Sequence, residues 1–155
     1  MEQKYQNKNI IIKELFIKML LKKGKKNLAE KIYNNILIEL RKKTKQKPIF
    51  ILIKIINILS PGVKLINVPI SKRKIKRRKN RYYLMFLNLE NSYKIVINWI
   101  LFYSRKRKTN FLKNVINEIY NILDNKGKSI NKRNEIGIEL NKLRHSIKFT
   151  KKMTY

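Results

Sequence analysis

The sequence predicts a mostly α-helical fold, a bundle of about six helices from which a basic, two-stranded β-ribbon protrudes. Six segments repeat apolar residues at intervals of three and four, which is the spacing of one buried helix face. Residues 63–68 and 82–89 break this pattern, because they are rich in β-branched, aromatic and aliphatic residues, and a strongly basic stretch separates them. The 155 residues are enough for one domain with its own core and short for two. We therefore expect a single domain over residues 1–155, with the ribbon at about 63–89 and a short basic tail at 150–155.

Two helices are expected in the first part of the chain. The first covers residues 10–22 and ends at Gly24, since glycine commonly follows a helix. The second covers about residues 27–43, where Asn27 and Glu30 have the spacing of a capping box. The expected buried faces are Ile12, Leu15, Phe16, Met19 and Leu20 in the first helix, and Leu28, Ile32, Ile36 and Leu40 in the second.

A third helix is expected over residues 48–59, with Pro48 at its first position, where the missing backbone N–H is tolerated. The apolar run at 49–59 contains a lysine and an asparagine and is too short to span a bilayer. We therefore interpret it as a core helix and expect no membrane partner. A break at residues 60–62 ends it.

The expected ribbon has a basic tip. Eight of the eleven residues from Ser71 to Arg81 are cationic, and none is acidic. A two-stranded ribbon is only marginally stable alone in water. Because the charges at the tip repel one another, we expect the tip to move until an anion neutralises it. Tyr82 or Tyr83, directly after the tip, is a candidate for stacking on a nucleic-acid base.

Three more helices are expected after the ribbon. The fourth begins at residue 91 or 92 and ends before the cations at 105–108, which are favourable at a helix C-terminus. Thr109 or Asn110 caps the fifth helix, and the sixth begins at residue 129 or 131. The expected buried faces are Tyr93, Val96, Trp99 or Ile100, and Tyr103 in the fourth helix, Phe111, Leu112, Val115, Ile119 and Ile122 in the fifth, and Ile136, Leu140, Leu143 and Ile147 in the sixth.

The charge of the chain is strongly one-sided. There are 39 Lys and Arg residues against 9 Asp and Glu residues, which gives a formal net charge of +30. A compact chain with this charge repels itself, so we expect it to bind a polyanion. Hydrophobic residues still make up 43% of the chain, which is too many for a disordered basic tail. A compact helical body with an extended ribbon suits a folded RNA better than duplex DNA, so structured RNA is the expected partner.

The residue types that most active sites use are scarce. The chain has no cysteine, and His145 is its one histidine, which excludes disulfides, thiolate catalysis and histidine-rich metal sites. The nine acidic residues are spread out. The closest two, Glu135 and Glu139, lie one helical turn apart and suit ion pairs better than magnesium. We therefore expect no catalytic residue, no metal and no cofactor.

Several short motifs follow one another in an informative order. They are Gly24-Lys25-Lys26 with Ala29-Glu30-Lys31-Ile32, Lys43-Thr44 with Pro48, Ser60-Pro61, Trp99 with Arg105-Lys106-Arg107, Asn117-Glu118-Ile119, Gly127 with Ile130, Lys132 and Arg133, Glu139 with Asn141-Lys142, and Lys148-Phe149. In this order and spacing, over about residues 13–149, the chain resembles the family of small-subunit ribosomal protein seven, in its organellar type.

The resemblance implies a mostly helical structural constituent of the small ribosomal subunit that is not an enzyme. It also implies that the chain binds the 3′ major domain of small-subunit ribosomal RNA, nucleates assembly of the head, and lies near the exit-site transfer RNA, the messenger path and neighbouring head proteins. The residues expected to contact ribosomal RNA are Lys22, Lys23, Lys25, Lys26, Lys72, Arg73, Lys74, Lys76, Arg77, Arg78, Arg81, Arg105, Lys106, Arg107, Lys132, Arg133, Lys142 and Lys148.

The composition also bears on where the protein works. Ile occurs 26 times, Lys 30 times and Asn 19 times, and these residues have A/T-rich codons. We expect no targeting sequence in the polar first nine residues. The expected setting is a mitochondrial ribosome and an organelle-encoded gene, with a plastid-type organelle or a reduced bacterium as alternatives. Two other functions stay open: a DNA-compacting or other general nucleic-acid-binding module and, less favoured, an intron-associated nuclease.

Overall fold

The computed structural model describes residues 2–68, 81–143 and 147–149. The predicted fold class is confirmed: these residues form six helices and an antiparallel two-stranded ribbon, which a short third strand joins. The elements are α1 (Glu2–Leu20), α2 (Lys26–Thr44), α3 (Pro48–Leu59), β1 (Val63–Val68), β2 (Arg81–Phe86), α4 (Leu89–Arg105), α5 (Phe111–Leu123), α6 (Lys128–Lys142) and β3 (Ile147–Phe149). The predicted tail at 150–155 and most of the predicted basic tip, residues 71–80, lie outside the described residues.

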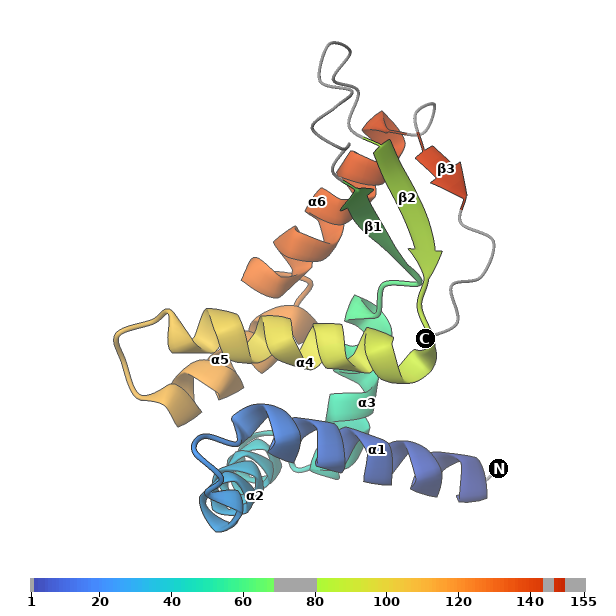
Figure 1. The fold of residues 1–155 in the computed structure, drawn as a ribbon. Helices are drawn as coiled ribbons and strands as arrows, with labels where there is room; N and C mark the ends of the chain where they lie inside the picture. The colour runs from blue at the N-terminus through green and yellow to red at the C-terminus, as the bar shows by residue number, and fades with distance from the viewer. Residues whose placement is uncertain (1, 69–80, 144–146, 150–155) are drawn as a thin grey trace.

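The helices form a body, and the ribbon stands at one end of it (Figure 1). α1 and α5 each pack against α2 and α4, and α3 passes through the middle, where it touches α2, α4, α5 and α6. Six of the twelve residues of α3 are buried, which confirms it as a core helix. α6 leaves the body after its first turns and runs beside the ribbon, so its C-terminal end and the strands lie at the same end of the molecule.

The predicted buried faces of the first two helices are confirmed with one correction. In α1, Ile12, Leu15 and Phe16 are almost fully buried. The buried residues of α2 are Ala29, Tyr33, Ile36 and Leu40. Leu28, which the spacing predicts to be buried, is instead 53% exposed. The inward face of α2 runs through Ala29, so the first turn of this helix is rotated by one position from the predicted register.

α1 is longer than the sequence predicts, since it begins at Glu2 rather than at Ile10. It ends at Leu20, so Gly24 is not its cap. Lys23 and Gly24 both have positive φ angles, of 50° and 73°, and form the turn between α1 and α2. Gly24 has no side chain and so adopts its positive φ angle without strain, which helps to form the turn rather than the end of α1.

The predicted capping box at the start of α2 is wrong. Lys25 occupies the N-cap position and makes no side-chain capping hydrogen bond. The carboxylate of Glu30 does not reach back to Asn27 and instead lies 3.9 Å from Nζ of Lys26 in an exposed ion pair. The turn is closed by its backbone, because the N–H of Lys26 donates to the carbonyl oxygen of Gly24 at 2.8 Å.

The ribbon pairs as the sequence predicts. β1 and β2 run antiparallel, with Val63 opposite Phe86 at the base and Val68 opposite Arg81 at the far end. β2 ends at Phe86, three residues earlier than predicted, because Asn88 is already the N-cap of α4.

The sequence did not predict the third strand. α6 ends at Lys142 rather than continuing to Ile147, and Ile147–Phe149 forms β3. β3 runs parallel to β2, with Ile147 opposite Tyr82. The backbone groups on the outer edge of β2 therefore bond to β3. In a ribbon without a third strand, water would have to satisfy these groups.

The last three helices follow the predicted pattern with small shifts. α4 begins at Leu89, and of the two residues Trp99 and Ile100 it is Ile100 that is buried. Asn110 caps α5, because its side chain accepts a hydrogen bond from a backbone N–H of the first turn at 3.0 Å. α6 begins at Lys128, and its apolar face is only half-buried because the helix leaves the body.

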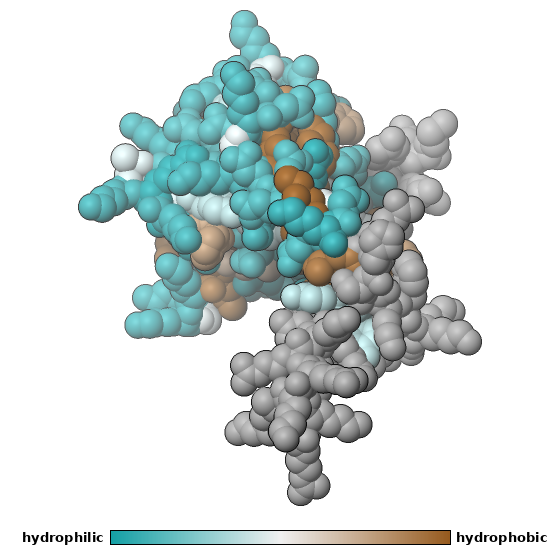
Figure 2. All heavy atoms as spheres, turned by 90° about the horizontal axis from the view of Figure 1, so that it is seen from above, coloured by the Kyte–Doolittle hydropathy of each residue, from teal (hydrophilic) through white to brown (hydrophobic). Residues whose placement is uncertain are grey.

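Much of the described surface is hydrophilic. Seen from the ribbon end, polar side chains cover most of the described atoms, and a narrow band of apolar side chains crosses them (Figure 2). No helix among the described residues is both long and apolar enough to cross a membrane. The same residues contain no group of three or more His, Cys, Asp or Glu side chains that could hold a metal ion.

Candidate nucleic-acid interface

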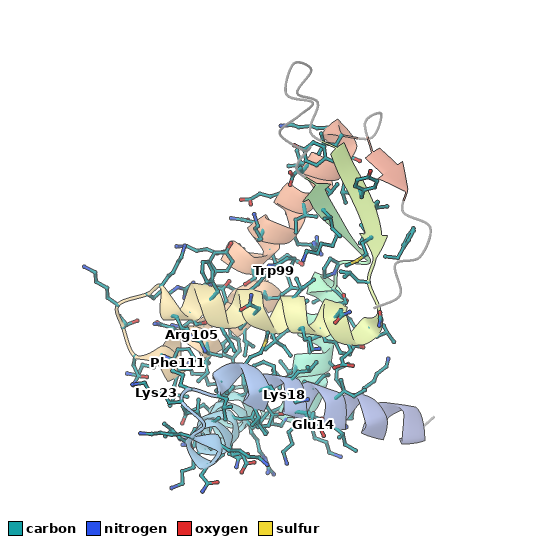
Figure 3. The ribbon with its side chains drawn as sticks, viewed as in Figure 1. Glu14, Lys18, Lys23, Trp99, Arg105 and Phe111 are labelled. Carbon is teal, nitrogen blue, oxygen red and sulfur yellow. The ribbon has the colours of Figure 1, made fainter. Side chains whose placement is uncertain are left out.

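Cations from two basic blocks, residues 22–26 and 105–108, which are far apart in the sequence, line one groove. We call it the loop groove: it lies between the α1–α2 turn and the α4–α5 loop and has a volume of about 500 Å³. Its lining residues are Leu20, Lys22, Lys25, Leu28, Ala29, Ile32, Ser104, Arg105, Arg107, Thr109 and Phe111. Figure 3 shows Lys23, Arg105 and Phe111 at this end of the molecule, where α1 and α4 both end.

The loop groove combines a cationic rim with an apolar floor. Lys22 and Lys25 come from the turn, Arg105 and Arg107 come from the loop, and none of the lining residues is acidic. The apolar lining residues are Leu20, Leu28, Ala29, Ile32 and Phe111. Exposed cations around a groove without acidic lining residues suit phosphate groups, because each phosphate that a cation neutralises releases a counterion.

Two cations of the α4–α5 loop also make contacts within the molecule. Nη2 of Arg105 donates to the carbonyl oxygen of Met19 at 3.0 Å, which ties the end of α4 to the end of α1. This bond uses one of the five N–H donors of the guanidinium. Nζ of Lys106 lies 4.3 Å from the centre of the Phe102 ring, in an exposed cation–π contact. Both side chains are exposed, so both can still meet a ligand.

Asn114, a buried residue of α5, fixes the backbone of this loop. Its side-chain Nδ2 donates to the carbonyl oxygens of Ser104, Arg107 and Thr109, at 3.2, 3.4 and 3.1 Å. The hydroxyl of Thr109 donates in turn to Oδ1 of Asn114. One buried amide therefore binds the two ends and the middle of the loop, which holds the cations of the loop in place.

Glu118, one turn further along α5, fixes the side chain of Arg107. Its carboxylate is fully buried and lies 2.6 Å from Nη2 of Arg107. The other carboxylate oxygen accepts from the backbone N–H and the hydroxyl of Ser129, at 3.1 and 2.9 Å. Ser129 lies in the first turn of α6, where the helix dipole also favours a negative charge. Glu118 thus joins the loop, α5 and α6.

Gly127 makes room for this carboxylate. Its φ angle is +112°, in the region that favours glycine, and a Cβ atom there would lie 3.2 Å from Oε1 of Glu118. A larger residue would therefore strain the backbone and crowd the buried acid at the same time.

The sequence prediction of the site missed both Asn114 and Glu118. A signal was present, because residues 114 and 118 lie four apart and next to the buried positions 115, 119 and 122 on the same helix face. A polar residue on an inward face, in a chain with only nine acids, indicates a buried hydrogen-bond network.

Two predicted contact residues of α6 have partners within the molecule. Nζ of Lys132 lies 2.9 Å from the carboxylate of Glu135, and this hydrogen bond and charge raise the pKa of Lys132 above its ordinary value. Nη1 of Arg133 donates to the carbonyl oxygen of Ile58 at 2.7 Å, at the C-terminal end of α3. Arg133 therefore provides a hydrogen-bond donor to a carbonyl oxygen at the end of α3, while its side chain stays exposed to a ligand.

The remaining predicted residues spread over the ribbon end. Lys142 is exposed at the last residue of α6, Lys148 lies in β3 opposite Tyr83, and Arg81 begins β2. The predicted contacts from Lys72 to Arg78 lie outside the described residues. The structure therefore brings predicted residues from 22–26 and 105–107 together at the loop groove, whereas Lys132, Arg133 and Lys142 of α6 do not line it.

The sequence prediction also left out a basic cluster at the end of α2. Five of the seven residues from 41 to 47 are cationic, namely Arg41, Lys42, Lys43, Lys45 and Lys47. Three of them line a second pocket of about 360 Å³ between α2 and α3. Lys42 pairs with Glu39 at 3.1 Å, and Nζ of Lys43 lies 5.5 Å from the centre of the Tyr120 ring. The density of charge in residues 41–47 was the signal that could have found this cluster.

Comparison with known proteins identifies one matching family. A sequence model of the family described as ribosomal protein S7p/S5e matches residues 1–137. Small ribosomal subunit protein uS7c of Pleurastrum terricola is 30% identical over 129 residues, which are 83% of this chain and 80% of that protein. Small ribosomal subunit protein uS7m of Reclinomonas americana is 29% identical over 128 residues, or 82% and 76% of the two chains. Small ribosomal subunit protein uS7 of Pelagibacter ubique is 28% identical over 133 residues, or 84% and 79%.

Proposed function

Because the chain belongs to the ribosomal protein S7p/S5e family, we propose that it binds the RNA of a small ribosomal subunit directly, mainly through phosphate contacts. The family membership that the motifs predicted is confirmed. It makes the chain a structural component of the small ribosomal subunit rather than an enzyme.

The convergence of two basic blocks on the loop groove is the observation that carries this proposal. Four cations from the α1–α2 turn and from the end of α4 with its loop line one groove that has no acidic lining residue. Lys22, Lys25 and Arg105 are exposed there, whereas Arg107 is paired with buried Glu118. A protein surface arranged in this way reads the shape and the phosphates of a folded RNA rather than its base edges. Arg133 and Lys142, which are exposed on α6, supply further phosphate contacts away from the loop groove.

The finer assignment follows the family. The chain binds the 3′ major domain of the ribosomal RNA, nucleates assembly of the head, and lies near the exit-site transfer RNA, the messenger path and other head proteins. The arrangement of the elements is consistent with several RNA contacts, because the α1–α2 turn and the α4–α5 loop lie apart from the ribbon (Figure 1).

Relatives of this chain include organellar forms, and these support an organelle ribosome. Within that range we propose the mitochondrial ribosome, on the A/T-rich codon preference of the composition. A plastid-type organelle is the alternative.

The test compares RNA with DNA. The purified chain is titrated, at matched salt, with a transcript of the 3′ major domain from the same genome and with random duplex DNA of equal length. We expect the transcript to bind at least tenfold more tightly. Equal affinities would favour a DNA-compacting module, and magnesium-dependent cleavage of either substrate by the pure chain would favour a nuclease.

A second measurement places the chain in the particle. The chain should sediment with small ribosomal subunits from the organelle after a high-salt wash. Release of the chain from otherwise intact subunits would contradict a structural role.

A further inference from the structure

We propose that the loop groove receives one unpaired nucleotide of the bound RNA, with its base on the apolar floor and its phosphate on the cationic rim. This inference rests on the proposed RNA binding and specifies what the groove recognises. An RNA duplex would use the rim alone and leave the floor empty.

The floor keeps part of its apolar surface exposed, although Leu20 and Ala29 are buried. Leu28 is 53% exposed, although its side chain lies beside the buried Ala29 in the first turn of α2. Phe111, at the start of α5, faces the same groove and is only half-buried. Apolar and aromatic faces of this kind are where proteins stack bases that have left a helix.

The rim supplies positive charge for the phosphate of the nucleotide. Lys22, Lys25 and Arg105 are exposed around the groove, and no lining residue is acidic. A double-stranded RNA presents phosphates on its outside and keeps its bases stacked inside. The combination of cations with an open apolar floor therefore fits a nucleotide whose base is turned out of the stack.

The groove is also formed before any ligand binds. Asn114 holds the backbone of the α4–α5 loop at three carbonyl oxygens, and the Arg105 bond to Met19 ties the two walls together. A site that is already rigid loses little entropy on binding. Its volume of about 500 Å³ lies within the range of roughly 300–1,000 Å³ that is usual for small-ligand pockets.

The groove should accept any base. The two hydroxyl groups that line it already donate within the protein, Ser104 to the carbonyl oxygen of Ile100 at 2.7 Å and Thr109 to Asn114. These hydroxyl donors are therefore not free for base edges, and we expect recognition mainly through stacking and charge, which every nucleotide offers.

Three RNA hairpins test the inference: one with a single bulged uridine, one with an abasic site at the bulge, and one that is fully paired. The affinity of the full chain for each is measured by fluorescence anisotropy at the same salt concentration. We expect the bulged hairpin to bind about tenfold more tightly than the abasic one, since the base alone differs. Replacing the uridine by adenine should change the affinity less than threefold.

Matched variants locate the effect. Leu28→Ser should reduce the difference between bulged and abasic hairpins to less than twofold. Ile38→Ser is the control, because Ile38 is 50% exposed on the same helix and does not line the loop groove. This variant should keep the full difference. Lys25→Ala should weaken binding of all three hairpins by a similar factor.

The outcomes separate the inference from the proposed function. Equal binding of the bulged and abasic hairpins, or an unchanged difference in Leu28→Ser, overturns the inference while the RNA binding stands. A chain that binds no RNA overturns both. Displacement of the bulged hairpin by a polyglutamate peptide, lost in Leu28→Ser, would assign the groove to an acidic protein segment and overturn the inference as well.

Discussion

The two ends of the molecule hold their cations in different ways. The loop end consists of the α1–α2 turn and the α4–α5 loop, and the ribbon end consists of the three strands and α6. At the loop end, the buried side chains of Asn114 and Glu118 hold the backbone and Arg107. At the ribbon end, backbone ladders hold the strands, and the ion pair of Lys132 with Glu135 is exposed. The role of a cation in this protein therefore depends on whether its partners are buried side chains or exposed ones.

The largest expected effect follows from Glu118→Ala. This change leaves Arg107, whose side chain is only 27% exposed, without its acid, and leaves two buried donors of Ser129 without an acceptor. The free energy of unfolding should fall by about 3 kcal/mol, measured by urea denaturation. The control Glu135→Ala breaks an exposed pair and should cost less than about 0.5 kcal/mol. Equal losses would show that the two ends are supported alike.

The next effect is on RNA binding. Replacing Lys22, Lys25 and Arg105 by alanine removes three exposed cations of the loop groove. The slope of log affinity against log salt should become shallower by about two to three, which is close to a hundredfold loss at about 0.15 M salt. Alanine at Lys13, Lys18 and Lys54 removes the same charge from exposed positions outside the groove. If this control lowers the slope as much, net charge rather than the groove determines the binding.

Asn114→Ala tests the support of the loop backbone. The loop loses a buried donor that serves three carbonyl oxygens, so stability should fall by about 2 kcal/mol. Asn117→Ala, at an exposed position of the same helix, should change stability by less than about 0.5 kcal/mol. Hydrogen exchange of the amides at 105–109 should quicken in Asn114→Ala alone. Unchanged exchange would remove Asn114 from the support of the loop.

The smallest expected effect is a difference in stability between alanine variants of two cations on α6. Arg133→Ala loses a hydrogen bond to the carbonyl oxygen of Ile58 and should lower stability by about 1 kcal/mol. Lys142→Ala, at an exposed position of the same helix, should leave the thermal midpoint unchanged and make the salt slope shallower by about 0.7–0.9. A loss of stability in Lys142→Ala as large as that in Arg133→Ala would contradict this difference.

Much of the local structure follows from the sequence alone. The core helix at Pro48–Leu59, the Asn110 cap and the two ribbon strands were all predictable, because a cap or an apolar face depends on residues within one or two turns of the chain. The predicted cap at Asn27 is wrong although the local motif is present, because Lys25, two residues earlier, occupies the N-cap position.

Only the tertiary structure decided which residues share a surface. The cations near residues 22 and 105 meet because α1 and α4 pack side by side and end together, and periodicity within either helix does not contain that information. In the sequence, Arg107 and Arg133 resemble any other surface cation, yet a carboxylate and a helix-end carbonyl lie within reach of them once the helices pack. Leu28 has the spacing of a core residue and faces the groove instead. Spacing along a helix sets which side chains point the same way, whereas long-range packing sets what they meet.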